Sequence, residues 1–195
     1  MSSSPDAPQP GGHDPTGTGS GTPHHGVPAG GPVPPRRHRR SGDGWVETPE
    51  GRFWGKFGAA GLLIHDPERG VLLQHRVAWS AEGGTWGIPG GAIDAGETAL
   101  AGAIRECHEE AGVPALDGTG VEVLDTHVLE KQGWSYTTVI AQATTRLEEF
   151  VNDIESVELA WVPLDEVEGY LLHPGFKNAW PHLRSVLEEN PPAGE

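Results

Sequence analysis

Three glutamates stand close together near the end of a predicted helix. Glu106, Glu109 and Glu110 fall within five consecutive residues. Carboxylates three or four positions apart on a helix repel one another by about 0.2–0.5 kcal/mol, and a position near the helix C-terminus is unfavourable with the helix dipole. Stability alone therefore gives no reason for the cluster. Hard divalent ions do, because Mg²⁺ and Mn²⁺ prefer oxygen ligands.

A helical wheel of Thr98–Ala111 separates these glutamates from an apolar face. At about 100° per residue, the three carboxylates share one sector, while the other sector contains the apolar side chains Leu100, Ala103, Ile104, Cys107 and Ala111. We expect the apolar sector to be buried. The acidic sector fits two interpretations, a solvated helix face or a metal centre.

A glycine-rich segment precedes this helix. Its glycines surround Pro89, and a further one stands directly before Glu97; they are Gly83, Gly84, Gly87, Gly90, Gly91 and Gly96. Glycine adopts backbone torsions that other residues avoid. The segment therefore predicts a turn that brings backbone carbonyl and amide groups close to a ligand lying on the helix.

Together these residues resemble the Nudix box. The pattern is G, five residues, E, seven residues, then R-E-U-x-E-E-x-G-U, where U is a bulky aliphatic residue. The chain matches it over 23 positions at Gly91, Glu97, Arg105, Glu106, Glu109, Glu110, Gly112 and Val113. Cys107 departs from the pattern at one aliphatic position, although free cysteine buries well. The broader resemblance runs from about residue 53 to residue 189.

The resemblance implies a fold and a role for each box residue. The fold is α+β, a Nudix-type α/β/α sandwich with a mixed β-sheet between helices. Glu106, Glu109, Glu110 and the carbonyl of Gly90 would hold Mg²⁺, or Mn²⁺ in its place. Arg105 would hold the glutamates in position, Glu97 would brace the loop and orient that arginine, and one glutamate could also activate water.

The resemblance also implies hydrolysis of a nucleoside diphosphate linked to another group, or of a nucleoside triphosphate at a pyrophosphate bond. Removal of damaged nucleotides such as 8-oxo-dGTP is the commonest expectation for so compact a chain. One alternative is a binding domain that senses nucleotides or sugar nucleotides without catalysis. Another is isomerisation of a prenyl diphosphate, which needs a reactive cysteine that the buried Cys107 does not supply.

Substrate-binding residues are less well specified. Many relatives add an acidic residue downstream of the box, and Glu155 is our candidate, with Glu149 and Asp153 as competitors. An ordinary acidic surface loop explains Glu155 equally well. Trp134 has the ring needed to stack a base, but packing explains it better. The identity of the substrate and the oligomeric state, including a homodimer, stay open.

Alternating and apolar segments predict the elements that would position the box. Strand formers occupy 57–65, 71–76, 121–130, 134–144 and 157–164, and a closing helix is expected over 178–189. With the helix at 98–111, this order predicts a mixed sheet packed against helices.

Charge and composition divide the chain of 195 residues. Residues 1–44 hold nine of the 18 prolines and ten of the 29 glycines, and we expect a disordered tail followed by one domain over 45–195. The basic run at 36–40 could contact polyphosphate, but a tether that touches the chain's own acidic domain is the better interpretation.

The rest of the composition excludes several classes of protein. The formal charge of −15 disfavours extended nucleic acid as a partner, so we expect a small nucleotide or other diphosphate. No apolar run is long enough to cross a membrane, and no signal peptide is recognisable, so a cytoplasmic location is expected. The single cysteine excludes a disulfide within the chain and a cysteine-rich zinc site.

Overall fold

The computed structural model describes residues 39–80 and 82–191. Its elements, in chain order, are β1 (Trp45–Thr48), β2 (Gly51–Trp54), β3 (Ala59–Asp66), β4 (Gly70–Arg76), β5 (Trp86–Gly87), β6 (Gly90–Ala92), α1 (Ala99–Ala111), β7 (Val121–Lys131), β8 (Trp134–Ala143), β9 (Ser156–Val162), the 3₁₀ helix η1 (Val167–Gly169) and α2 (Pro174–Glu189).

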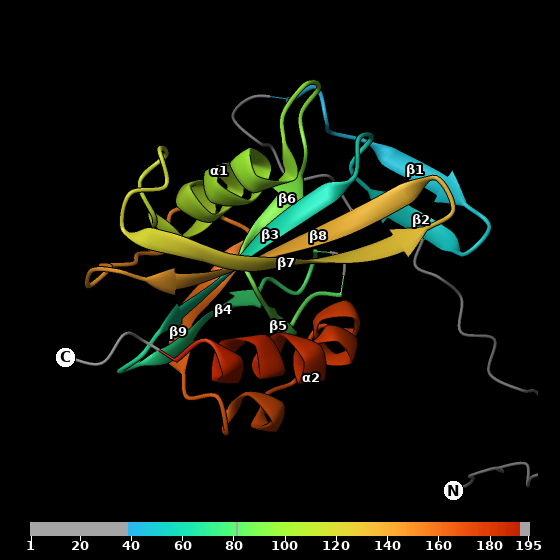
Figure 1. Cartoon of the computed structure of the whole chain (residues 1–195). Coiled ribbons are helices and arrows are strands. Elements are labelled where there is room, and N and C mark those ends of the chain that lie inside the picture. Colours follow the sequence, from blue (N-terminus) through green and yellow to red (C-terminus); the bar gives the residue numbers. More distant parts are fainter. Residues whose placement is uncertain (1–38, 81, 192–195) are drawn as a thin grey trace, which may run out of the picture. The chain divides into compact units, whose positions relative to one another are not determined.

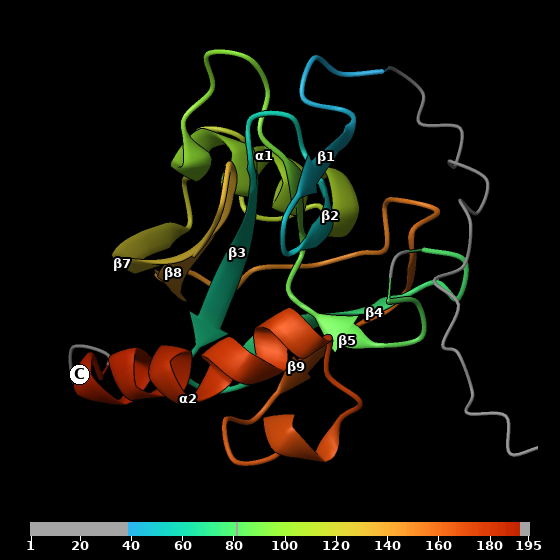
Figure 2. The same ribbon diagram turned by 90° about the vertical axis from the view of Figure 1, so that its right-hand side faces the viewer.

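A mixed sheet of seven strands forms the centre of the fold. Its main path runs β5-β4-β3-β8-β7, with β6 paired to β3 and β9 paired to β4. The β3–β8 pair is parallel, and the other pairs are antiparallel. The helices α1 and α2 cover opposite faces of this sheet (Figures 1 and 2). The predicted sandwich of helix, mixed sheet and helix is therefore confirmed.

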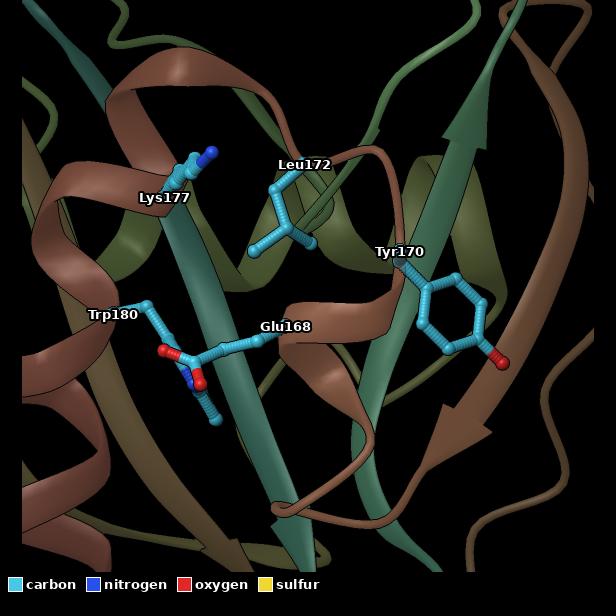
Figure 3. A pocket seen from close by; sticks show the side chains of 5 residues that line it. All are labelled: Glu168, Tyr170, Leu172, Lys177 and Trp180. Carbon is cyan, nitrogen blue, oxygen red and sulfur yellow. The ribbon is translucent and has the colours of Figure 1, made fainter.

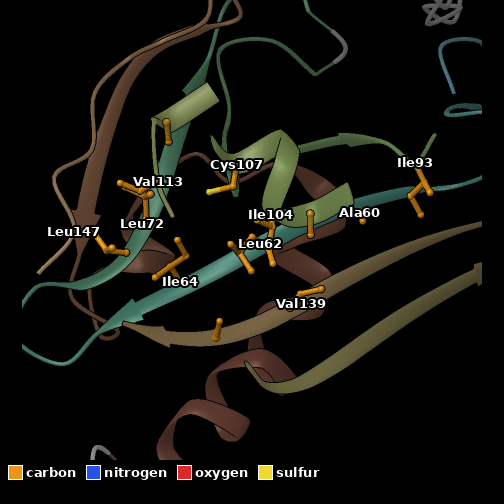
Figure 4. Packing of buried hydrophobic residues seen from close by; sticks show 13 residues of the cluster. Ala60, Leu62, Ile64, Leu72, Ile93, Ile104, Cys107, Val113, Val139 and Leu147 are labelled. Atoms are coloured by element: carbon orange, nitrogen blue, oxygen red, sulfur yellow. The ribbon is translucent and has the colours of Figure 1, made fainter. Parts of the chain in front are cut away.

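Two separate hydrophobic clusters hold the layers together. On the α1 face, Ile104 and Cys107 pack against Leu62, Ile64 and other apolar side chains of the sheet (Figure 4). On the α2 face, Trp180 and Leu183 pack with Leu63, Val71 and Ile140. Strand β3 contributes to both clusters because successive side chains of a strand point to opposite faces.

The helix expected over 98–111 is present, with Thr98 as its N-cap. Cys107 is fully buried in the α1-face cluster, as predicted, and burial raises the pKa of its thiol well above the usual range. The prediction for Leu100 was wrong, since this side chain is 40% exposed. A wheel gives an angle around the helix axis and not the extent of the surface on which the helix packs.

Some observed elements differ from the predicted ones where the sequence pattern is weak. Helix α2 begins at Pro174, four residues before the predicted start, because proline is favoured in the first turn of a helix. The antiparallel pair β1–β2 was not predicted. In that pair Trp45 packs edge-on against Trp54, and Phe53 stacks on Trp134.

The predicted tail lies outside the described residues over 1–38, and the boundary expected at residue 44 stays a prediction. Of the basic run at 36–40, the described part includes Arg40, whose side chain contacts Asp94 and Glu109. This contact agrees with a tether that touches the acidic domain. Within the described residues, no helix has both the length and the apolar character that membrane crossing requires.

Candidate metal centre

The box occupies a continuous path from β6 through a loop into α1. Strand β6 pairs with the start of β3, and the loop at 93–98 then leads from the sheet into α1 (Figure 1). The helix begins where the Thr98 hydroxyl accepts a hydrogen bond from the N–H of Ala101, and it ends at Gly112. Gly112 has φ 74°, a left-handed conformation that glycine adopts without strain.

Arg105 connects this loop with the glutamates. Its Nε donates to Glu97 Oε1 at 2.8 Å and its Nη2 to Glu97 Oε2 at 2.7 Å, a two-point contact of guanidinium with carboxylate. Nη2 also donates to the carbonyl of Ala92, and Nη1 donates to Glu106 Oε1 at 2.6 Å. These contacts raise the pKa of Arg105, with the Glu97 bond as the largest cause.

Glu97 in turn closes the loop. Its Oε2 accepts a hydrogen bond from the backbone N–H of Asp94, and its own N–H donates to the Asp94 carbonyl. The Arg105 hydrogen bond is the largest cause of the lowered pKa of Glu97. Glu97 thus contacts the loop and Arg105 contacts the box glutamate Glu106, while the roles that the resemblance implies for them stay predictions.

Glu106 points inward beneath β6 and is only 2% exposed. A Cβ atom added to Gly91 would lie 2.6 Å from the carboxyl carbon of Glu106, closer than real side-chain contacts allow. Glycine at this position therefore lets the backbone of β6 lie directly against a buried carboxylate. The box pattern contains the glycine without revealing this reason for it.

Glu110 is the second buried carboxylate, 3% exposed, and its Oε2 accepts a hydrogen bond from the N–H of Gly90 at 2.9 Å. Burial, as the largest cause, and the neighbouring charge of Glu106 raise the pKa of Glu110 to about 8, although Arg76 and the Gly90 N–H oppose the shift. The backbone N–H of Gly90 thus contacts the site by donating to Glu110. A role for its carbonyl stays a prediction.

Glu109 lies at the exposed edge of the same helix face, between two arginines. Its carboxylate pairs with Nη2 of Arg40 and lies 3.8 Å from Nη1 of Arg105. In this arrangement, no three His, Cys, Asp or Glu side chains among the described residues gather in a way that would hold a metal ion by themselves. The metal-ligand set predicted from the box therefore stays a prediction.

The donor chemistry nevertheless fits a hard divalent ion. Glu106 and Glu110 are two buried carboxyl groups, and ionising both at once is costly unless a cation compensates their like charges. Their oxygen atoms and the Gly90 peptide are ligands of the kind that Mg²⁺ and Mn²⁺ prefer. Glu109 would complete the set after exchanging its arginine contact for the ion.

Three further residues interact electrostatically with Glu110. Arg76, the last residue of β4, lowers the pKa of Glu110, while Glu155 raises it, so both charges lie close enough to interact with it. The phenol of Tyr136 lies against Gly61. Burial is the largest cause of its raised pKa, which Arg76 opposes and Glu110 increases.

The sequence indicated only one of these three. Glu155 was the candidate acid, and the structure brings it towards the box; its role stays a prediction. Arg76 and Tyr136 were missed, because each stands in a strand that reads as ordinary sheet. Only the pairing of β4, β3 and β8 brings them to the glutamates.

The contacts of Trp134 are those of a side chain that packs within the fold. Its ring stacks on Phe53 with centroids 4.6 Å apart, and its Nε1–H donates to the carbonyl of Trp54. One face of the ring is therefore covered by the β1–β2 hairpin. Stacking on a substrate base stays an untested role for Trp134.

A cavity of about 210 Å³ lies on the α2 face of the sheet, away from the box residues in the sequence (Figure 3). Its lining comes from η1, the segment after it and α2, namely Glu168, Tyr170, Leu172, Lys177 and Trp180. None of the predicted site residues is among them. Tyr170 and Leu172 connect the cavity to β5, where both contact Trp86.

Comparison with known proteins identifies the family. The profile described as NUDIX domain matches residues 55–186, more than half of the chain. The chain is a Nudix hydrolase. Enzymes of this family act on small nucleotide substrates by hydrolysing pyrophosphate bonds, so the predictions of family and enzyme class are confirmed.

Individual relatives extend over much of the chain. This Nudix hydrolase is 46% identical over 159 residues to a putative 8-oxo-dGTP diphosphatase 3 of Mycobacterium tuberculosis, covering 76% of this chain and 71% of that protein. It is 41% identical to a nucleoside triphosphate pyrophosphatase/Nudix hydrolase fusion protein of Bifidobacterium longum, covering 90% of this chain but only 37% of that longer protein.

The fold agrees with a solved relative. The crystal structure of the Nudix hydrolase RenU from M. smegmatis is 45% identical, with a TM-score of 0.69, and the match covers 79% of this chain and all of that one. An Ap4A hydrolase from C. elegans shares the fold at 21% identity and a TM-score of 0.56.

We predict that Glu110 makes the ion-free protein less stable as the pH rises. Its pKa is raised from 4.5 in the unfolded chain to about 8 in the folded one, so the folded state binds the extra proton between these values. This contribution is complete below about pH 4.5 and is lost as the pH rises through 8. Melting temperatures of the wild type and Glu110→Gln in EDTA, from pH 5.5 to 8.5, measure it. The variant should fall less with pH, and parallel curves would contradict the prediction.

The Arg105 network gives a second prediction. Arg105→Lys keeps the charge but loses the two-point contact with Glu97, so the free energy of unfolding should drop by about 1–3 kcal/mol. Urea unfolding of the ion-free protein measures this change. Arg184→Lys is a matched control, because Arg184 forms an exposed pair with Glu188 on α2. Equal stability of the Arg105→Lys variant and the wild type would show that the network does not hold the loop.

Proposed function

We propose that this Nudix hydrolase is a Mg²⁺-dependent pyrophosphohydrolase of nucleoside triphosphates that removes damaged nucleotides such as 8-oxo-dGTP. The observation that carries the metal dependence is the pair of buried carboxylates, Glu106 and Glu110, against the Gly90–Gly91 backbone. Arg105 compensates the charge of Glu106, but the pKa of Glu110 stays raised to about 8, so a bound cation would favour its ionised form. Glu109 stands beside them at the solvent edge, where a phosphate would arrive.

Each box residue would have its own role in the hydrolysis. Glu106, Glu109, Glu110 and the Gly90 carbonyl would hold the ion, which supplies charge to neutralise the phosphate oxygens and to acidify water. One of the three glutamates takes the proton as the water oxygen bonds to phosphorus, and the bridging oxygen leaves with the electron pair of the broken anhydride bond. Arg105 keeps Glu106 aimed at the site through its 2.6 Å contact.

Two observations support the substrate. The relative from M. tuberculosis, described as a putative 8-oxo-dGTP diphosphatase, is 46% identical over most of this chain. The chain carries a formal charge of −15, which repels extended polyanions but leaves a small nucleotide able to reach a site where an ion reverses the local sign.

The competing proposal is a domain that binds nucleotides without hydrolysing them. It shares the fold and the small-molecule partner, and it differs in releasing no product. All box glutamates are present, which favours catalysis over sensing.

The test is turnover of a substrate panel. Purified wild type, Glu110→Gln and Glu109→Gln would be incubated with Mg²⁺ and 8-oxo-dGTP, dGTP, ADP-ribose or Ap4A, and products would be quantified by chromatography. We expect 8-oxo-dGTP to be the best substrate, and each variant to lose about 100-fold or more in kcat because an ion ligand is removed.

Glu122→Gln, a change of the same type at an exposed position on β7, should keep wild-type turnover, and melting curves would show whether all three variants fold. Near-wild-type turnover in both box variants would disprove the assignment of the site. Tight binding of nucleotide with no release of product from any compound would favour the sensing domain.

A further inference from the structure

A short segment before β1 is fastened to the loop that enters α1. Asp94 Oδ1 accepts hydrogen bonds from the Ser41 hydroxyl and from the Gly42 N–H, both at 2.8 Å. The Ser41 oxygen in turn accepts a hydrogen bond from the N–H of Ala95. Residues distant in sequence thus form one joined unit at the entrance to the box helix.

The same segment is fastened on its other side. The N–H of Lys56 donates to the Gly42 carbonyl, and the N–H of Gly55 donates to the Gly44 carbonyl. A Cβ on Gly42 would collide with the backbone carbonyl of Ile93. The backbone next to Arg40 therefore has a fixed position relative to the loop and to α1.

The Arg40 side chain extends from this fixed backbone to the exposed edge of the box. Its Nη1 pairs with Asp94 Oδ2 at 3.2 Å, and its Nη2 pairs with Glu109. About one third of the side chain, 34%, is exposed. A guanidinium has several N–H donors in a planar fork that matches phosphate oxygens.

Arg105, by comparison, cannot serve a phosphate from its present position. It is 12% exposed, and its donors are directed at Glu97, Glu106 and the Ala92 carbonyl. Arg40 differs from Arg105 in the combination of its properties. It is partly exposed, it is anchored by Asp94, and it contacts Glu109, the outermost box glutamate.

We propose that Arg40 is a substrate-binding residue, which keeps its pair with Asp94 and exchanges Glu109 for a phosphate oxygen of the nucleotide. This inference rests on the proposed function, since Glu109 is released when it turns to the ion. Asp94 keeps the guanidinium in place during the exchange. The bound phosphate is then held from two sides, by the ion centre and by a cation of the segment before β1.

Equilibrium binding tests the proposal without relying on turnover. The probe is a nucleoside triphosphate analogue with a methylene group between the α and β phosphorus atoms, titrated calorimetrically in Mg²⁺ into the full chain. Loss of a charge-assisted contact with phosphate should weaken binding to Arg40→Ala about tenfold or more. Mg²⁺ alone should bind this variant at least as tightly as the wild type, because a competing cation has left Glu109.

Arg39→Ala is the matched control, since it removes the same charge one residue earlier, from an exposed side chain. It should change the analogue affinity less than twofold, and melting curves would show that both variants fold. An equal loss in both variants would mean general attraction by a basic segment and would overturn the proposal. Unchanged nucleotide binding in Arg40→Ala would also overturn it, as would weaker Mg²⁺ binding, which would show that Arg40 only positions Glu109.

Failure of the inference is distinguishable from failure of the proposed function. If Glu110→Gln is inactive while Arg40→Ala binds the analogue normally, the hydrolase assignment stands and the Arg40 role is wrong. If Glu110→Gln keeps full turnover, the assignment of the centre fails whatever Arg40 does.

Discussion

Glu106 and Glu110 bring two carboxylates of like charge into the protein beside each other, and an ionised carboxylate taken out of water costs several kcal/mol unless its surroundings compensate. The neighbouring structure supplies this compensation in pieces. Arg105 contacts Glu106, the Gly90 amide contacts Glu110, and Arg76 lowers the pKa of Glu110. These three groups come from α1, β6 and β4, so the carboxylate pair depends on the sheet as well as on its own helix.

The compensation is incomplete in the ion-free protein. The pKa of Glu110 remains raised to about 8, because burial and Glu106 outweigh the Gly90 hydrogen bond and Arg76. A site of this kind stores unfavourable electrostatic energy that a cation would relieve. The loop is stiff for a related reason. Glu97 links it to Arg105, and Asp94 links it to the segment before β1, so the carboxylates have little freedom to separate.

Much of the centre was predictable from the sequence because the box is local. Glu97, Arg105 and the three glutamates lie on one loop and one helix, and helical geometry alone puts the carboxylates on a common face. The residues of the site that the sequence did not indicate are brought there by strand pairing. Arg76 and Tyr136 reach Glu110 only because β4 and β8 both lie beside β3, and no local pattern specifies that order. Arg40 belongs to a run that predicted a contact with the acidic domain, but nothing in the run indicated Glu109 as the partner.

The sheet separates the two hydrophobic clusters, and its strands β3, β4 and β8 each contribute side chains to both. Side chains on the α2 face, including those that line the cavity near Trp180, can therefore change in size without disturbing the packing beneath α1. A lineage can accumulate substitutions on one side of such a molecule while the charged centre on the other side keeps its geometry. The sheet thus allows the sequence of the α2 face to change while the chemistry beneath α1 is preserved.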